Sequence, residues 1–417
     1  MFLKQPAKII DRHCGSGKTN GLISSLSQNR RYLIVVPYLS EVQRVINGAA
    51  ERGITIKEPC VASGFSNKRE HLIEMAQSGV NICTTHAMYP LLAEAAHNGV
   101  FSDYTIIIDE VVETVKSLNK TPNKATWQTV YLGDGYATVD EATGQVSPTE
   151  KWHSNYEQVS DAIWSELYHA AKSGTLYAHQ NDTLVWALPQ QILKAGCELI
   201  VYTYQSQGSM MVAYFKRVGI DFEIDTDDQL DEAFRRNAKK LINVKLLKGL
   251  TALKFSYSGQ VSMNEKGAQK VARTLNNLAK RDLKSSEVDR HDIIVTCIKA
   301  RWFQEGKSFD DLKMTDQKAR AGEFSKGSGL FHCNWLPNTT RGSNNWSNCS
   351  HVIYLYDQHP SPSVKSWLGM KGDWQDRYAL SEAIQLIWRS RIRRGEPITV
   401  YFASERMYAL FTEWLNA

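Results

Sequence analysis

The residues with the clearest chemical potential form one stretch near the start of the chain. It reads Asp11-Arg12-His13-Cys14-Gly15-Ser16-Gly17-Lys18-Thr19-Asn20 and lies between an apolar pair and a segment with helical apolar spacing. Glycines at 15 and 17 let the backbone turn with its N–H groups pointing inward, where a side chain would block a phosphate. A helix that begins at the end of this loop would add a partial positive charge. The stretch therefore predicts a phosphate-binding loop.

The end of this loop indicates which phosphate ligand to expect. We expect Lys18 to reach the β- and γ-phosphates of a nucleotide and the Thr19 hydroxyl to ligate Mg²⁺. An ordinary glycine turn would explain Gly-Ser-Gly alone, but not its continuation into Lys-Thr after an apolar strand. The sequence thus predicts ATP and Mg²⁺ as cofactors. The expected nucleotide-binding residues are Gly15, Ser16, Gly17, Lys18, Thr19 and Asn20.

Two carboxylates follow a second apolar strand, which begins at Tyr104 and continues through three isoleucines. Asp109 and Glu110 come directly at its end. Ligands of parallel α/β sheets gather beyond the carboxyl ends of the strands, where the glycine loop would also lie. We therefore expect Asp109 to hold Mg²⁺ through water and Glu110 to orient or deprotonate the attacking water. Alone, such an acidic pair is a common helix-start signal.

Three arginines near the end of the chain could contact a γ-phosphate. A helix is predicted from Ser381 to Arg393, with Gln385, Arg389 and Arg391 on the same polar side as Arg393. Arginine suits phosphate because its planar fork contacts two oxygens and stays charged. The alternative is a solvated basic face of a helix.

The bulk composition is that of a globular chain without low-complexity tracts. Its 417 residues are 42% hydrophobic and 22% charged, and the seven cysteines are scattered and odd in number. No apolar run approaches the roughly 20 residues of a membrane helix, and the first residues lack the apolar core of a signal peptide. We expect a protein of the reducing cytoplasm, in a bacterium or a phage-infected cell.

An alternation of apolar strands and amphipathic helices predicts two α/β domains in series, each with a mostly parallel sheet flanked by helices. The expected first domain spans residues 1–225 and the second 226–417, with an acidic linker between them. Residues 51–62 resemble a further strand–helix step. An accessory unit rich in tryptophan interrupts the first domain at about 114–195, and its aromatic residues could stack bases or pack a core.

Positive charge is concentrated at the start of the second half. Residues 234–302 contain 16 Lys and Arg against 5 Asp and Glu, whereas the whole chain carries only +5. This stretch is either a solvated basic face or a phosphate-binding surface.

The order of these stretches resembles superfamily 2 helicases, the DEAD/DEAH-like group, and especially its compact phage-encoded members. Motifs I, II, V and VI resemble Gly15–Thr19, Asp109–Val112, Thr340–Asn344 and Gln385–Arg389, and motifs Ia, Ib and III more loosely resemble Val36–Val42, Thr84–His86 and Thr203–Gln205. Trp388 replaces the usual glycine of motif VI, and Ile392 occupies the place of its final arginine. Arg391 and Arg393 therefore both stay open as the second arginine beside Arg389.

This resemblance implies two tandem RecA-like domains that hydrolyse ATP with Mg²⁺ to move along and unwind nucleic acid. The track it implies is DNA in phage replication or recombination, with RNA as the alternative and a replication or recombination protein as a partner. It also implies Lys18, Glu110 and the arginines as catalytic residues, and Gln385 as a further nucleotide-binding residue. The implied nucleic-acid contacts are Pro37, Thr85, His86, Thr340 and Arg341.

Two rival functions fit part of the same pattern. A terminase-type packaging motor shares the glycine loop and acidic strand, but would need metal-binding carboxylates in the second half. A nucleotide-gated remodelling ATPase would hydrolyse ATP without separating strands. Separately, His332-Cys333 and Cys349-x-His351 offer zinc-capable side chains. They lack the usual Cys-x-x-Cys spacing, so buried strand cysteines are the better explanation.

Overall fold

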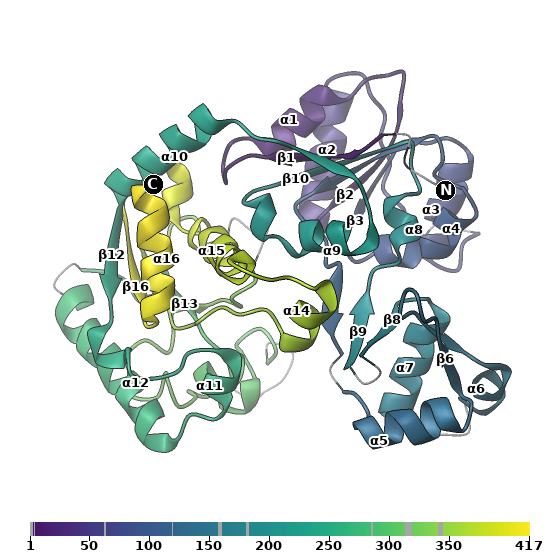
Figure 1. The fold of residues 1–417 in the computed structure, drawn as a ribbon. Helices are drawn as coiled ribbons and strands as arrows, with labels where there is room; N and C mark the ends of the chain where they lie inside the picture. Colours follow the sequence, from purple (N-terminus) through teal and green to yellow (C-terminus); the bar gives the residue numbers. More distant parts are fainter. Residues whose placement is uncertain are drawn as a thin grey trace. The chain divides into compact units, whose positions relative to one another are not determined.

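The computed structural model divides the chain into two compact units (Figure 1). It describes residues 3, 5–61, 64–118, 120–156, 161–180, 183–284, 287–312, 319–340 and 345–417. The first unit comprises Met1–Arg12, Gly17–Thr226 and Pro360–Gly372, and the second comprises His13–Ser16, Asp227–His359 and Asp373–Ala417. No helix in the described part of the chain is long and apolar enough to cross a membrane.

A six-stranded parallel sheet forms the centre of the first unit. Its strand order is β11-β1-β10-β4-β2-β3. The strands are β1 (Ala7–Asp11), β2 (Arg31–Val36), β3 (Ile82–Thr85), β4 (Tyr104–Asp109), β10 (Glu198–Thr203) and β11 (Phe222–Asp225). Every pairing in this sheet is parallel, so all six carboxyl ends share one edge. The strand β4 is buried along its whole length, as its run of isoleucines predicts.

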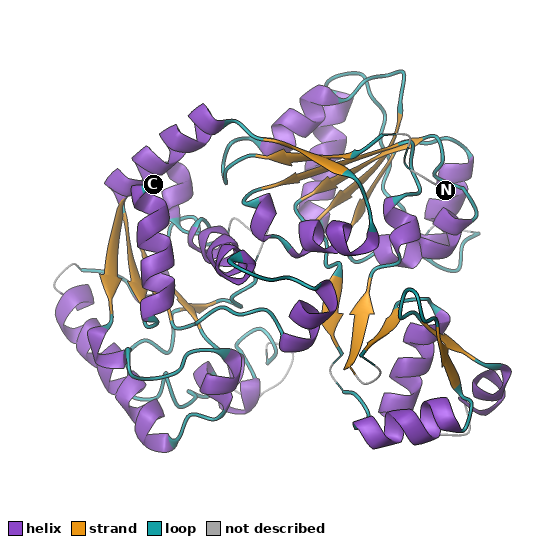
Figure 2. Ribbon diagram, viewed as in Figure 1, coloured by secondary structure: helices purple, strands orange, loops and turns teal. Residues whose placement is uncertain are grey.

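Helices cover both faces of this sheet (Figure 2). They are α1 (Lys18–Ser25), α2 (Leu39–Ala50), α3 (Lys68–Gln77), α4 (Ala93–His97), α8 (Gln190–Leu193) and α9 (Met210–Val218). The apolar residues of α1 and α2 pack against β2 in one core, which includes Leu22, Val42 and Ile34. Residues 51–62 do not form the expected strand–helix step. In its described part, residues 51–61, only an isolated parallel bridge from Lys57 to Ile82 occurs, so this part is an irregular edge.

The accessory unit is built from two small antiparallel sheets and short helices. Its sheets are β5 (Val115–Ser117), β9 (Thr183–Ala187) and β8 (Leu176–His179), and the hairpin β6 (Ala137–Val139) and β7 (Val146–Pro148). Its helices are α5 (Lys124–Thr126), the π-helical η2 (Trp127–Gly133), α6 (Glu150–Asn155) and α7 (Ala162–Lys172). Trp127, Trp152 and Trp164 are buried together in its core. Of the two interpretations of these tryptophans, core packing is the one observed, because buried rings cannot stack on bases.

A segment from late in the chain completes the first unit. The helix α14 (Pro362–Leu368) packs against β5, β9 and α9 (Figure 1). Trp367 lies with its ring centroid 5.4 Å from that of Tyr177 and 6.0 Å from that of Tyr214. In the second unit, Arg406 forms ion pairs with Asp357 and Asp376, which lie on either side of this segment in the sequence.

The second unit contains a five-stranded parallel sheet with the order β12-β16-β15-β13-β14. Its strands are β12 (Ile242–Leu246), β13 (Ile293–Thr296), β14 (Asn334–Trp335), β15 (His351–Tyr354) and β16 (Ile398–Phe402). Its helices include α10 (Asp228–Leu241), α11 (Tyr257–Val261), α12 (Glu265–Leu278), α13 (Lys299–Trp302), α15 (Trp374–Ile387) and α16 (Glu405–Asn416).

The helix predicted from Ser381 to Arg393 is wrong in its bounds and its exposure. The observed helix α15 starts earlier and ends at Ile387, and the arginines follow in the 3-10 turn η9 (Arg391–Arg394) and just before it. Gln385 and Arg389 are only 3% and 4% exposed. The prediction failed because α15 is buried on nearly all sides, so its polar residues do not mark a solvated face.

Candidate nucleotide site

The glycine loop connects β1 to the start of α1. Gly15 and Gly17 have φ angles of 83° and 80°, which lie in the left-handed region that glycine adopts without strain. The helix α1 begins at Lys18, directly after Gly17. A strand, a glycine turn and a helix N-terminus thus follow one another as the sequence predicts, and backbone N–H groups at a helix N-terminus favour a bound anion.

Lys18 extends from the first turn of α1 toward the carboxyl edge of the sheet. Its Nζ donates to the carbonyl oxygen of Arg12 at 3.2 Å and lies 3.7 Å from Oε1 of Glu110. The lysine side chain is 7% exposed and the glutamate side chain 16%. The ammonium and the carboxylate form a local ion pair, which holds the Lys18 ammonium next to the glycine loop.

Thr19 and Asp109 form the second contact between loop and strand. Oγ1 of Thr19 donates to Oδ2 of Asp109 at 2.8 Å. Asp109 is 4% exposed. Burial raises the pKa of Asp109 to about 6, and the nearby Glu110 carboxylate adds to this rise. A hydroxyl and a carboxylate side by side are oxygen ligands of the kind Mg²⁺ takes, and a cation there would favour the ionised carboxylate.

Glu110 has an unusual backbone conformation. Its φ angle is 63°, in the left-handed region where non-glycine residues are uncommon. Its N–H donates to the carbonyl oxygen of Tyr202 at 2.9 Å, so the turn is held by the neighbouring strand β10. Such backbone conformations concentrate at active sites, where the surrounding structure holds them. Here the turn directs the chain away from β4 with the Glu110 carboxylate beside Lys18.

Asp11 is a residue of this edge to which the sequence assigned no role. Its two carboxylate oxygens accept hydrogen bonds from the backbone N–H groups of Gln205 at 3.0 Å and Ser206 at 2.8 Å. The hydroxyls of Thr203 and Ser206 are buried without a hydrogen-bond partner among the described residues. The loop after β10, where motif III was expected, is thereby tied to the start of the glycine loop. The only signal in the sequence for this role of Asp11 was that an acidic residue directly follows the apolar residues of the first strand.

The residues expected to contact nucleic acid fall into two groups, one at the carboxyl edge of the first sheet and one in the second half of the chain. Pro37 and Thr85 are partly exposed and follow or end β2 and β3 at the same edge of the sheet. Nε2 of His86 donates to the carbonyl oxygen of Asp109 at 2.9 Å, so this ring is joined to the acidic strand. Arg341 lies outside the described residues, and Thr340 Oγ1 donates to the carbonyl oxygen of Pro337 at 2.7 Å.

Two other expected residues already have partners. The Oδ1 of Asn20 accepts a hydrogen bond from Nη2 of Arg44 at 2.8 Å. In the second unit, Nε of Arg391 donates to the carbonyl oxygen of Pro397 at 2.6 Å. Arg391 and His351 help to line a pocket of about 430 Å³ at the amino ends of β15 and β16. Burial lowers the pKa of His351 to about 4, and the Arg391 charge lowers it further.

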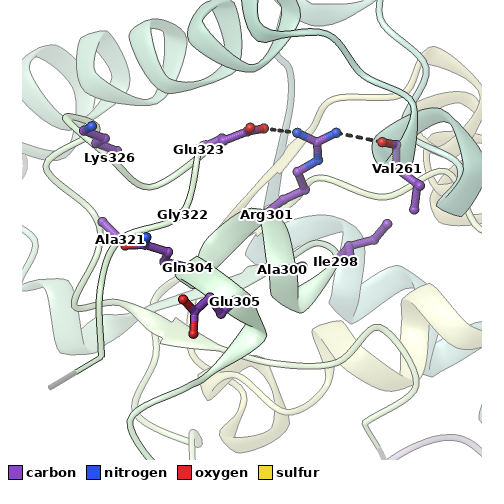
Figure 3. A pocket seen from close by; sticks show the side chains of 10 residues that line it. All are labelled: Val261, Ile298, Ala300, Arg301, Gln304, Glu305, Ala321, Gly322, Glu323 and Lys326. Atoms are coloured by element: carbon purple, nitrogen blue, oxygen red, sulfur yellow. Dashed lines mark hydrogen bonds and ion pairs between the residues drawn. The ribbon is translucent and has the colours of Figure 1, made fainter. Parts of the chain in front are cut away.

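Another pocket of the second unit, about 560 Å³ in volume, lies beyond the carboxyl end of β13 (Figure 3). Arg301 is its most prominent charged group. The guanidinium is paired with Glu323 and also donates to the carbonyl oxygens of Gln260 at 2.8 Å and Val261 at 2.9 Å. These contacts close the wall of the pocket. Arg301 is thus a structural residue, whose guanidinium is already engaged by Glu323 and by backbone carbonyl oxygens.

The zinc-capable pairs do not assemble into a metal site in the described residues. No group of three or more His, Cys, Asp and Glu residues there could hold a metal ion. Cys333 and Cys349 are 3% and 2% exposed. Burial raises the pKa of both thiols to about 12, which disfavours the thiolate form that binds zinc.

Comparisons with known proteins give one family match, one relative over the whole chain and several solved structures of similar fold. Residues 236–415 match the family described as the YonV C-terminal Rossmann-like domain. Over 423 aligned residues the chain is 25% identical to the SPbeta prophage-derived protein YonV of Bacillus subtilis (strain 168), and 98% of each chain is covered.

The fold is similar to solved structures of XPD. One, in the apo form, has a TM-score of 0.53 at 14% sequence identity, and the match covers 99% of this chain and 96% of the XPD chain. The structure of S. tokodaii Xpd4 has a TM-score of 0.50 at 13% sequence identity, and the match covers 99% of this chain and 95% of the Xpd4 chain. This likeness shows the fold: two RecA-like domains in tandem, each with a parallel sheet flanked by helices.

Proposed function

We propose that this protein is a nucleic-acid-dependent ATPase of the superfamily 2 type that translocates along DNA and separates its strands. The observation that carries the proposal is the meeting of four side chains at one edge of the first sheet. Lys18 and Thr19 come from the glycine loop, and Asp109 and Glu110 come from β4. Fold likeness alone would not assign an activity, because one fold supports many functions.

These residues fit a nucleotide with Mg²⁺. Lys18 would hold the β- and γ-phosphate oxygens, exchanging its contact with the Arg12 carbonyl for a phosphate. Thr19 and Asp109 would hold Mg²⁺, which when bound neutralises charge on the phosphate oxygens. Their adjacent oxygens and the raised pKa of Asp109 both suit a site that gains a cation.

Glu110 is the residue that we assign to the attacking water. It would accept the proton of that water while its carboxylate stays beside Lys18, and its hydrogen bond to Tyr202 fixes where the side chain starts. Arg389, Arg391 and Arg393 remain predicted contacts of the γ-phosphate, on the strength of the motif VI resemblance. The proposed DNA track and a role in phage replication or recombination are supported by the prophage origin of the relative YonV.

ATP turnover with different nucleic acids tests the proposal. Turnover is measured alone and with single-stranded DNA, duplex DNA or single-stranded RNA, at low and moderate salt, for the wild type and Lys18→Ala. We expect strong stimulation by single-stranded DNA that is lost in the variant. Lys8→Ala, an exposed lysine of β1 away from the loop, is the matched control and should behave as the wild type.

Each other outcome changes the proposal in a defined way. Stimulation by RNA alone would replace the DNA track. Turnover that depends on Lys18 but ignores every nucleic acid would favour a remodelling ATPase with a protein client. Turnover that survives Lys18→Ala would contradict the site itself.

A further inference from the structure

One helical surface of the second unit carries a row of cations. The helix α12 (Glu265–Leu278) continues directly into the π-helical turn η6 (Ala279–Leu283). Its inner face is apolar and belongs to the main core of the unit, through Val271, Leu275 and Leu278. On the outer side, the exposed cations are Lys266, Lys270, Arg273, Lys280, Arg281 and Lys284, which we call the basic face.

The basic face is not neutralised by the rest of the described structure. None of its six residues forms an ion pair with a described acid. Asp282, on the same turn, is instead paired with Lys245 at 3.5 Å. Glu265, the acid at the start of α12, accepts a hydrogen bond from Gln269. The charges therefore face solvent together.

A second helix of the same unit shows what an ordinary solvated basic helix looks like. The helix α10 has 14 residues, as α12 does, and its second half lies in the same basic stretch of the sequence. In α10, Arg235 pairs with Asp231 at 3.4 Å and Arg236 with Glu232 at 3.7 Å, each at a spacing of four residues. Oppositely charged pairs at this spacing stabilise a helix.

In α12 the corresponding neighbours have like charges. Lys266 and Lys270 are four residues apart, and Lys270 and Arg273 are three apart, so these pairs repel and destabilise the helix. A basic face that costs helix stability is not explained as a device for stabilising the helix. It is explained if a polyanion binds there.

We propose that the basic face binds the phosphate backbone of duplex nucleic acid, at a place separate from the site that moves along one strand. Residues 265–284 contain no aromatic residue, whereas single-strand sites combine cations with aromatic side chains on which bases stack. At 1.5 Å per residue the cations from Lys266 to Lys284 span about 27 Å, the length of roughly eight base pairs.

The inference rests on the proposed function, because it assigns to the basic face the duplex that lies ahead of or behind the strand along which the protein moves. The two can fail separately. Binding to the basic face is measured without ATP, whereas the proposed function is tested by ATP turnover that depends on Lys18. Unchanged duplex binding after removal of the basic face would overturn this inference alone, whereas ATP turnover that survives Lys18→Ala would overturn the proposed function alone.

The experiment measures duplex binding as a function of salt. Anisotropy of a labelled 20-base-pair DNA is followed at several salt concentrations for the triple variant Lys266→Gln, Lys270→Gln, Arg273→Gln. If each cation neutralises one phosphate, the slope of log K against log salt falls in magnitude by about 2.7. The matched control removes three cations of α10 (Arg236→Gln, Lys239→Gln, Lys240→Gln) and should leave the slope unchanged.

Additional variants and ligands distinguish the proposed contact from a folding defect and from binding of another ligand. The charge-preserving variant Lys266→Arg, Lys270→Arg, Arg273→Lys should restore the wild-type slope, which a general folding defect would not allow. An equal loss in the α10 control would overturn the proposal, because bulk charge alone would explain it. Equal weakening toward oligo-dT would overturn the choice of duplex, and tighter binding of poly-glutamate than of DNA would point to an acidic protein.

Discussion

The carboxyl edges of the two parallel sheets differ, although both sheets have the same kind of topology. At the first edge, buried polar groups meet across strands: Thr19 contacts Asp109, and the Asp11 carboxylate holds the loop after β10. At the second edge, the amide of Gln260 closes the space between β13 and β15. It donates to the carbonyl oxygen of Leu355 at 3.0 Å and accepts from the N–H of Ile298 at 3.1 Å.

This difference shows that the buried polar groups at the two edges have different roles. Gln260 is fully buried with both ends of its amide hydrogen-bonded, which makes a rigid edge. Asp109 is nearly as buried but keeps a raised pKa, so its ionised form is held at a cost. We infer that the first edge is arranged for a ligand and the second for the scaffold.

The largest expected effect is on catalysis at the first edge. Glu110→Gln should lower ATP turnover by about 10² to 10⁴-fold while ATP binding persists, because an amide cannot accept the proton of water. Single-turnover hydrolysis and equilibrium nucleotide binding measure the two quantities. Glu113→Gln, at an exposed glutamate three residues on, should leave both unchanged. Wild-type turnover in Glu110→Gln would remove Glu110 as the base.

The second edge should respond in stability rather than in chemistry. Gln260→Leu leaves the carbonyls of Phe255 and Leu355 and the N–H of Ile298 without their partner. We expect the free energy of unfolding to fall by about 3 kcal/mol, measured by urea titration. The exposed Gln269→Leu serves as the control and should change it by less than about 0.5 kcal/mol. Equal stability of both variants would mean that Gln260 does not fix this edge.

The amino end of the second sheet provides a test by pH. His351 has a folded pKa of about 4, below its ordinary value, so the unfolded chain binds the extra proton first as the pH falls. The free energy of unfolding should therefore drop by about 2 kcal/mol between pH 6.5 and pH 4 through this residue. His351→Asn should lose that part of the pH dependence, whereas replacing the exposed His291 by Asn should keep it. A drop of the same size in His351→Asn would assign it to other groups.

The smallest expected effect is a gain in the free energy of unfolding when Asp109 is replaced, opposite in sign to the loss expected for Gln260. Because the folded pKa of Asp109 is raised to about 6, its contribution to stability is lost as the pH rises from about 4 through 6. Asp109→Asn should thus raise the free energy of unfolding by about 1 to 2 kcal/mol at pH 8, with chelator present. Asp103→Asn, at an exposed position, should not. Destabilisation by Asp109→Asn would show that the contact with Thr19 outweighs the burial of charge.

Local signals in the sequence were sufficient to predict that the glycine turn and the two carboxylates meet at one edge of the sheet. The glycine turn before Lys18 and the carboxylates after the isoleucine strand both depend on neighbouring residues, and the structure places Thr19 beside Asp109. Contacts between distant residues left no local pattern. The hydrogen bond from His86 to the Asp109 carbonyl could not be predicted, because it depends on the order of strands. The burial of Arg389 was missed because the helix that precedes it is buried on nearly all sides although it carries polar residues, and its sequence resembles that of a solvated helix.

The helix α14 has a consequence for how the protein is made. The first unit needs Trp367 against Tyr177 and Tyr214, but 141 residues separate Thr226 from Trp367 in the chain. At ribosomal speeds of about 5 to 20 residues per second, this apolar surface waits for roughly 7 to 28 s before its cover is synthesised. A gene fragment that stops at Thr226 would leave the same surface bare permanently, so a separately expressed amino-terminal half should aggregate unless the segment Pro360–Gly372 is supplied with it.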